Sequence, residues 1–170
     1  MRLSTKARYG VMAMVELARM QTIQTTPVSL STLSQRQNLP LAYLEQIFLK
    51  LRKQDLVKSI RGSSGGYSLS KKASEISIFQ IIKAVGKPLK ATRCPVNSQE
   101  GCQQQGSRCL THDLWSSLGD VVQIFLEKVS LEDVFQGNFM SKNIFHNQKD
   151  RDIFAFIQSE NKGLGANCQS

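Results

Sequence analysis

The chain has 170 residues and a mass of 19.0 kDa, enough for one compact domain or for a small domain with an oligomerisation arm. Hydrophobic residues make up 41% of it, yet no apolar run approaches the ~20 residues of a membrane span, so the composition argues against a membrane protein. The N-terminal MRLSTKARYG lacks the apolar core of a signal peptide, so we expect a cytoplasmic protein. In a reducing cytosol, four cysteines suggest ligation or redox chemistry rather than disulfides.

The formal charge of +9 lies entirely in the first half of the chain. Residues 1–90 hold 15 basic and four acidic side chains, whereas residues 91–170 hold seven basic and nine acidic ones. Because neutralising phosphates requires clustered cations, this asymmetry predicts a nucleic-acid-binding head joined to a separate sensing or pairing module. The alternative is a basic surface that serves only solubility.

The first half reads as helices separated by short loops. Residues 4–20 carry one apolar stripe, with Ser4 or Thr5 available as the N-cap. A short second helix falls within 28–37, ended by Asn38 and Pro40, and residues 41–54 place apolar side chains at spacings of three, one and three.

Two helices joined by a tight turn predict a helix-turn-helix, whose second helix enters the major groove. Residues 56–61 and 67–70 read as strands around a Gly/Ser turn, and a hairpin directly after such a helix is a wing. A plain surface hairpin is the alternative. Glycines at the tip let the backbone approach a phosphate or a narrow minor groove. The candidate DNA-binding residues are Ala42, Tyr43, Glu45, Gln46, Lys50, Lys53, Arg61, Gly62, Gly65 and Gly66.

A helix with Ser77 and Gln80 as a capping box is expected to close a winged helix-turn-helix domain over residues 1–86. Residues 87–112 lack apolar periodicity and form a predicted ligand loop. Over 113–136 we expect a dimerisation helix, whose apolar face is broad, and a short capping helix; packing of that face on its own domain is the alternative. Residues 137–170 read as a flexible tail. The fold class is therefore mostly α, with a β-hairpin wing.

Four soft donors fall in or beside the ligand loop, namely Cys94, Cys102, Cys109 and His112, separated by seven, six and two residues. Structural zinc sites usually use closer cysteine pairs, so zinc remains possible but less favoured. Three thiolates and one imidazole can instead ligate the two irons of a 2Fe-2S cluster. His112 follows a predicted N-cap at Thr111, so metal binding would couple directly to the position of the next helix. Unrelated thiols beside a helix-start histidine are the remaining alternative.

The segments MRLSTKARYG, LAYLEQIFLKLRKQDLVKSIRGSSGGY and ATRC…C…CLTHDLW resemble the IscR family of bacterial winged-helix regulators, over residues 1 to about 135. The resemblance implies a homodimeric transcription factor that binds promoter DNA and carries one 2Fe-2S cluster per subunit on the four donors. It also implies that the iron-sulfur assembly machinery donates the cluster, and that the cluster-bound form chiefly represses the assembly operon, its own gene included. Both forms would act at a second class of promoter.

Some positions depart from the family pattern. The first two ligand gaps are longer than is usual, and Pro40 and Ala42 replace serines of well-known relatives. Glu45 is retained, and the resemblance implies that this carboxylate discriminates between operator classes. Related nitric-oxide sensors use an early aspartate as a ligand, whereas residues 2–9 here contain no acid.

An enzyme is not expected, because the chain offers no paired histidine and carboxylate and no Gly-rich nucleotide loop leading into a helix. The other open readings are a related regulator sensing nitric oxide, iron or redox state, a zinc-stabilised DNA-binding module, and an electron-transfer protein.

Overall fold

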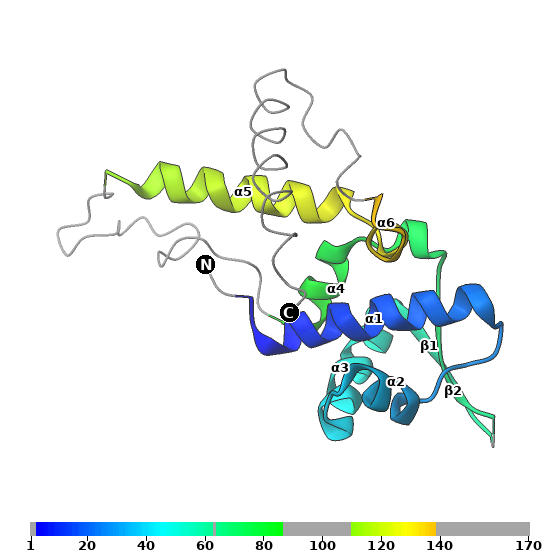
Figure 1. Ribbon diagram of the computed structural model, residues 1–170. Coiled ribbons are helices and arrows are strands. Elements are labelled where there is room, and N and C mark those ends of the chain that lie inside the picture. The colour runs from blue at the N-terminus through cyan, green and yellow to red at the C-terminus, as the bar shows by residue number, and fades with distance from the viewer. Residues whose placement is uncertain (1–2, 63, 87–109, 139–170) are drawn as a thin grey trace, which may run out of the picture. The chain divides into compact units, whose positions relative to one another are not determined.

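The computed structural model describes residues 3–62, 64–86 and 110–138, all within one unit, Met1–Phe139 (Figure 1). The elements in chain order are α1 (Thr5–Ile23), α2 (Leu30–Gln37), α3 (Leu41–Lys53), β1 (Val57–Ile60), β2 (Gly66–Leu69), η1 (Ala73–Glu75), α4 (Ile78–Val85), α5 (His112–Lys128) and α6 (Leu131–Gln136). This order confirms the mostly helical class with a hairpin. The predicted tail lies outside the described residues beyond Asn138.

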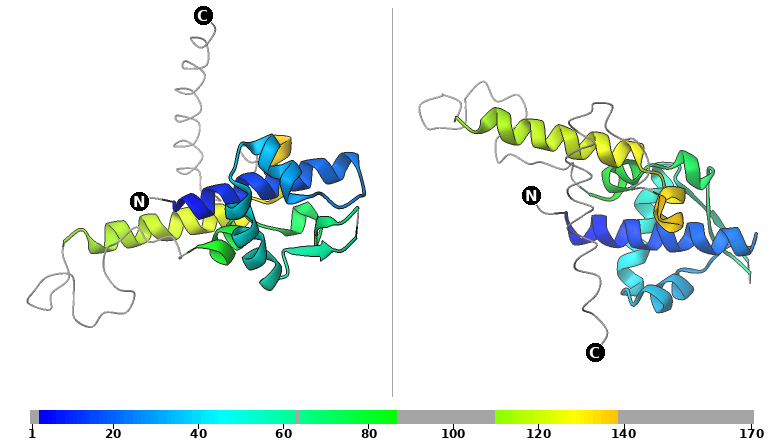
Figure 2. Two further views of the ribbon diagram at one scale, coloured as in Figure 1. Left: turned by 90° about the horizontal axis from the view of Figure 1, so that it is seen from below. Right: turned by 45° about the horizontal axis from the view of Figure 1, so that its top comes forward.

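Helix α1 is the central element of the core. Ser4 caps it by accepting a hydrogen bond from the Ala7 backbone N–H at 3.2 Å, as predicted. The helix runs one turn past the predicted end at residue 20. Its buried side chains, which include Met14 and Leu17, let it pack against α2, α3, α4 and α6. The two views of Figure 2 show these helices around it.

Helices α2 and α3 form the predicted helix-turn-helix. The α2 helix ends at Asn38, which adopts the left-handed conformation (φ 49°), and the Ser34 hydroxyl donates to the Leu39 carbonyl at 2.5 Å. Pro40 is the N-cap of α3, where a missing backbone N–H leaves no bond unmade. The predicted apolar stripe of α3 is confirmed, with Leu44, Ile47, Phe48 and Leu51 all buried.

The strands β1 and β2 pair antiparallel, with Val57 opposite Leu69 and Ile60 opposite Gly66. We call residues 57–69 the wing. A bridge between Val28 and Tyr67 joins β2 to the residues before α2. The Tyr67 ring also meets the Phe48 ring edge to face, with centroids 5.0 Å apart. The wing is thus fixed to α3 and to the segment that leads into α2.

Helices α4 and α6 each begin with a full capping box, built on Ser77 and Gln80 in α4 and on Ser130 and Asp133 in α6. A bridge between Ser77 and Ser130 joins the two starts. Helix α6 packs on α1 and η1, so the chain returns to the winged core after α5.

Helix α5 contacts α4, while none of its residues is fully buried. Across the described ranges, no helix combines the length and apolarity that crossing a membrane requires.

Candidate nucleic-acid interface and metal centre

The outer face of α3 presents the predicted base-reading residues. Ala42, Glu45, Gln46 and Lys53 are exposed on it. A carboxylate on this surface is repelled by phosphates but can accept a hydrogen bond from a cytosine amino group in the major groove. The exposed face of α3 therefore has the mixed amide, acid and cation chemistry that direct readout of base edges uses.

Tyr43 is half-buried and holds the start of α3 against α1. Its ring meets the Tyr9 ring edge to face, with centroids 5.5 Å apart. The Lys6 ammonium lies 5.8 Å from the Tyr43 ring centroid, within the range of a cation–π contact. The Tyr43 ring therefore contacts two side chains of α1, in addition to any contact that it makes with DNA.

Lys50 differs from the other predicted contacts on α3. Its Nζ donates a hydrogen bond to the backbone carbonyl of Val85, the last residue of α4, at 3.2 Å. The residue is exposed, but this contact turns its ammonium group toward α4.

The wing tip holds Arg61 and Gly62, both exposed, and Gly62 has a φ of 121°, which L side chains rarely adopt. A Cβ at Gly65 would lie 2.5 Å from the Ile60 carbonyl oxygen, and one at Gly66 would lie 2.5 Å from the Val28 carbonyl oxygen. Glycine is thus required at 65 and 66 by the close approach of the chain to itself, a reason that sequence reasoning had not supplied.

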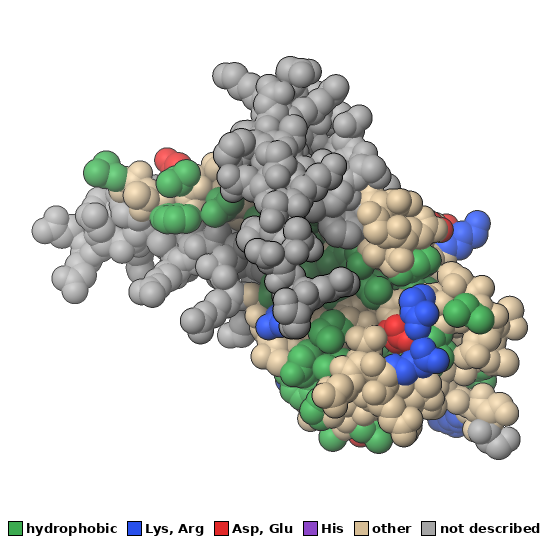
Figure 3. Space-filling view, viewed as in Figure 1, with side chains coloured by type: hydrophobic (Ala, Val, Ile, Leu, Met, Phe, Trp, Pro, Cys, Tyr) green, Lys and Arg blue, Asp and Glu red, His purple; other side chains and the backbone are tan. Residues whose placement is uncertain are grey.

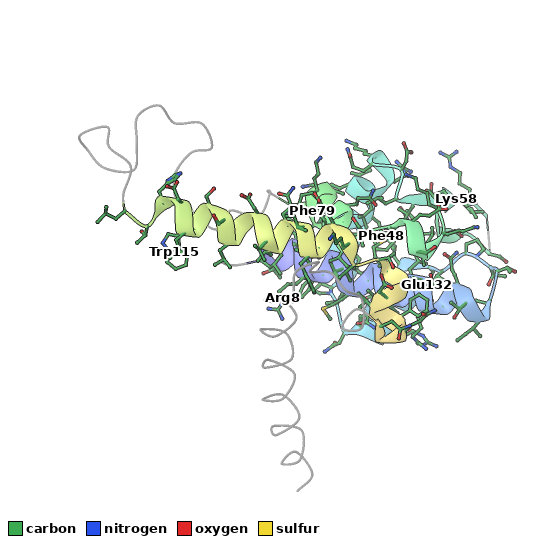
Figure 4. All side chains as sticks on the ribbon, turned by 90° about the horizontal axis from the view of Figure 1, so that it is seen from above. Arg8, Phe48, Lys58, Phe79, Trp115 and Glu132 are labelled. Atoms are coloured by element: carbon green, nitrogen blue, oxygen red, sulfur yellow. The ribbon has the colours of Figure 1, made fainter. Side chains whose placement is uncertain are left out.

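Arg52 is a residue that sequence reasoning missed. Its Nη1 donates to the Ser59 hydroxyl at 3.3 Å, so an exposed cation links α3 to β1. Lys58, labelled in Figure 4, lies beside Ser59 on β1 and is also exposed. The cationic surface therefore extends from α3 onto the first strand of the wing. Cations outside the apolar stripe of α3 were a signal available in the sequence.

A buried carboxylate on α1 was also missed. Glu16 is only 7% exposed, and it accepts hydrogen bonds from Arg19 at 2.8 and 3.1 Å, from Arg36 at 3.3 Å and from Gln37 at 3.3 Å. The Arg19 hydrogen bond is the main reason that the pKa of Glu16 is lowered, with burial opposing it and Arg36 assisting. Figure 3 shows an acidic group among basic ones over α1 and α2. The cluster fixes α2 to α1.

Three of the four predicted ligands, Cys94, Cys102 and Cys109, lie outside the described residues. The fourth, His112, is the first residue of α5, with Thr111 as the N-cap, as predicted. The Thr111 side chain makes no capping hydrogen bond. Within the described ranges, no group of three or more His, Cys, Asp or Glu side chains is placed to hold a metal ion.

The chemistry of this donor set fits an iron-sulfur cluster. Thiolates are the usual cluster ligands, and imidazole replaces thiolate in some 2Fe-2S centres. In the sequence, the donors fall between the end of α4 at Val85 and the first turn of α5.

Helix α5 exposes large apolar side chains: Leu114 at 62%, Trp115, Val121 and Ile124 each at 45%, and Leu118 at 42%. Figure 4 shows Trp115 near the N-terminal end of α5, away from Phe48 in the core. Val122, Phe125 and Leu126, toward the other end, are half-buried. Packing on α4 therefore covers only part of the predicted apolar face, and an exposed part remains.

Comparison with known proteins shows which family this chain resembles. A family model described as Rrf2, iron-dependent transcriptional regulator, matches residues 3–137. The HTH-type transcriptional regulator IscR of Photorhabdus laumondii is 49% identical over 134 residues, covering 79% of each chain. IscR of Pectobacterium carotovorum is 47% identical over the same length and coverage.

Solved structures agree with the sequence matches. CymR, titled the global cysteine regulator of B. subtilis, has a TM-score of 0.66 and 33% identity, covering 80% of this chain and 97% of its own. IscR of T. potens has a TM-score of 0.64 and 30% identity, covering 87% of this chain and 93% of its own. The resemblance to IscR and the winged-helix fold are thereby confirmed. The chain belongs to the Rrf2 family and is a DNA-binding transcriptional regulator rather than an enzyme.

Proposed function

We propose that this regulator is a homodimer that senses iron-sulfur cluster supply through one bound 2Fe-2S cluster per subunit. In this proposal, it chiefly represses the genes of cluster biogenesis, its own operon included. The observation that carries the proposal is the position of His112 at the first turn of α5, which places the last of the four donors on the helix whose apolar face is exposed.

DNA binding would use the two surfaces already described. The exposed face of α3, with Glu45 and Gln46, would read base edges in the major groove. Arg61 at the wing tip would contact phosphates or the minor groove beside it. The net positive charge of residues 1–90 supports this assignment, since phosphate neutralisation supplies much of the affinity for DNA.

The exposed apolar face of α5 would be covered by the same helix of a second subunit. Side chains such as Leu118 and Val121 are too exposed to be explained by packing on α4 alone. A dimer would also present two α3 helices, which can read half-sites roughly 34–36 Å apart on one face of the duplex.

Cys94, Cys102, Cys109 and His112 would hold the cluster, which supplies a group whose occupancy reports cluster supply. Because His112 starts α5, occupancy would bias the position of that helix and so the spacing of the two winged heads. Coupling of this kind typically changes affinity by about 5–150-fold.

The decisive experiment is a footprint of the metal-free and cluster-bound protein on its own promoter, after anaerobic purification. We expect a reddish-brown protein with about two irons per chain, and a footprint that differs between the two forms at one or more sites. A colourless, zinc-loaded protein would contradict the sensor, and identical footprints at every operator would contradict the regulation. If the cluster is easily reduced and the protein does not bind DNA, a role in electron transfer would be favoured instead.

Two variants sharpen this test. Cys102→Ala should abolish the colour while leaving some DNA binding, whereas Cys168→Ala, a cysteine outside the four donors, should leave the colour intact. If Cys102→Ala loses fold and dimer together, the metal is structural.

Salt dependence tests the DNA-binding surface independently of the metal. The logarithm of the binding constant should fall by about 0.9 per phosphate neutralised for each tenfold rise in salt. Arg61→Ala should weaken binding and reduce that slope. A flat salt dependence would argue against the cationic surface.

A further inference from the structure

The end of α4 is a meeting point of three helices. Lys50 of α3 donates to the Val85 carbonyl at 3.2 Å, and the Val85 side chain is fully buried. A Cβ placed on Gly10 of α1 would lie 3.3 Å from a Val85 methyl group, so α1 approaches closely there. The last carbonyls of a helix have no partner within it, and a cation is favoured beside them. Lys50 therefore satisfies the α4 C-terminus from outside that helix.

The start of α4 is tied to the far end of α5. The Ile78 N–H donates to the Val129 carbonyl at 2.9 Å, and the Leu131 N–H donates to the Ile76 carbonyl at 2.9 Å. Val129 is the C-cap of α5. A shift of α5 would therefore be passed to α4 through backbone hydrogen bonds, which are short and directional.

The predicted ligand loop connects the two helices in the sequence. It follows the end of α4 at Val85 and leads into α5 at His112. In this inference, a change in that segment would reach α4 at Val85, which precedes it in the sequence, and at Ile78, through α5. Among the hydrogen bonds between side chains and backbone in the described part of the chain, the Lys50 contact is the one that joins α4 to α3.

We propose that Lys50 is a positioning residue, which sets the placement of α3 according to the state of the ligand segment rather than serving mainly as a DNA contact. The proposal rests on the proposed cluster-dependent regulation. When its ammonium group is held at Val85, Lys50 orients the helix that carries Glu45 and Gln46, while Lys53 on the same helix stays exposed for phosphate contact. Loss of the donor would remove this hydrogen bond and leave only the packing of α3 on α4.

The test is the ratio of dissociation constants for operator DNA between metal-free and cluster-bound full-length protein. Lys50→Met keeps the apolar stem and removes the donor, and we expect it to shrink the ratio by about fivefold or more. Lys50→Arg keeps a cationic donor and should preserve the ratio. Lys53→Met is the matched control, which should weaken both forms by the same factor and leave the ratio unchanged. Iron content and circular dichroism should match the unmodified protein in all three.

Two results would overturn the inference. In one, Lys50→Met weakens both forms equally, as Lys53→Met does, which would make Lys50 an ordinary phosphate contact. In the other, Lys50→Met changes the operator affinity of neither form. Failure of the proposed function is a separate outcome, because the unmodified protein would then show a ratio of one. If Lys50→Met does not fold, Lys50→Leu, which also lacks a donor, carries the same test with the same criteria.

Discussion

Glu16 on α1 and Arg36 on α2 form an ion pair, with Oε1 and Nη1 3.3 Å apart. The carboxylate is 8% exposed, while the arginine is half exposed. Arg19 and Gln37 donate to the same carboxylate. The pair therefore connects the first helix of the helix-turn-helix to the central helix of the core, through a buried acid that Arg19 also neutralises.

Glu16→Ala should destabilise the protein. The change removes an acceptor of several charge-assisted hydrogen bonds and leaves Arg36 and Gln37 without it, and hydrogen bonds to charged groups contribute about 1.5–3 kcal/mol. We expect a loss of about 2 kcal/mol in the free energy of unfolding, measured by urea denaturation. The control is Glu75→Ala, an exposed acid in η1, which should change stability little. Equal effects of the two changes would contradict the role of the cluster.

The same carboxylate predicts the pH dependence of stability. The pKa of Glu16 lies below its ordinary value of 4.5, chiefly because Arg19 hydrogen-bonds to it. A lowered pKa means that the unfolded chain takes up this proton first as the pH falls, so the ionised carboxylate stabilises the fold above pH 4.5 and loses that contribution as the pH drops through the folded pKa. Unfolding free energies of the unmodified protein and Glu16→Gln should therefore differ at neutral pH and converge below this window. If the difference in unfolding free energy between the two proteins stayed the same in acid, the lowered pKa of Glu16 would be contradicted.

The first residue of β2, Gly66, predicts a steric effect in the wing. In Gly66→Ala, the new methyl group would lie 2.5 Å from the Val28 carbonyl oxygen, at the bridge that joins the wing to the residues before α2. Because backbone has to move to relieve this contact, we expect a loss of about 1–3 kcal/mol in unfolding free energy and weaker operator binding. The measurements are thermal unfolding and an electrophoretic shift assay. Ser64→Ala, at an exposed position on the same hairpin, should leave both unchanged.

Elements that depend on nearby residues were predictable from the sequence. The buried stripe of α3 follows from spacings of three, one and three, and the capping box of Ser77 and Gln80 follows from residues three positions apart. The N-cap at Thr111 was found in the same way. These signals are local, so a single sequence contains them.

Contacts between distant segments were not predictable in this way. The Glu16 cluster joins residues about 20 positions apart, and helical periodicity predicts only that an acid interrupts the apolar stripe. The bridge between Val28 and Tyr67 involves too few residues to form an alternating pattern. The packing of α6 on α1 and the contact of Lys50 with Val85 likewise depend on how the helices are arranged in three dimensions.

The exposed face of α5 predicts how the protein assembles. Leu118 and Val121 are 42% and 45% exposed, and both would be buried in the proposed dimer, so the double change Leu118→Lys and Val121→Lys should place two desolvated charges in that contact. We expect a monomer in analytical ultracentrifugation, with operator affinity reduced at least about tenfold because the two heads no longer bind as a linked pair. Ser116→Lys, on the opposite polar face of the helix, should remain dimeric. A double variant that stays dimeric would show that another surface pairs the subunits, and a monomeric parent protein would remove the need for pairing through α5 altogether.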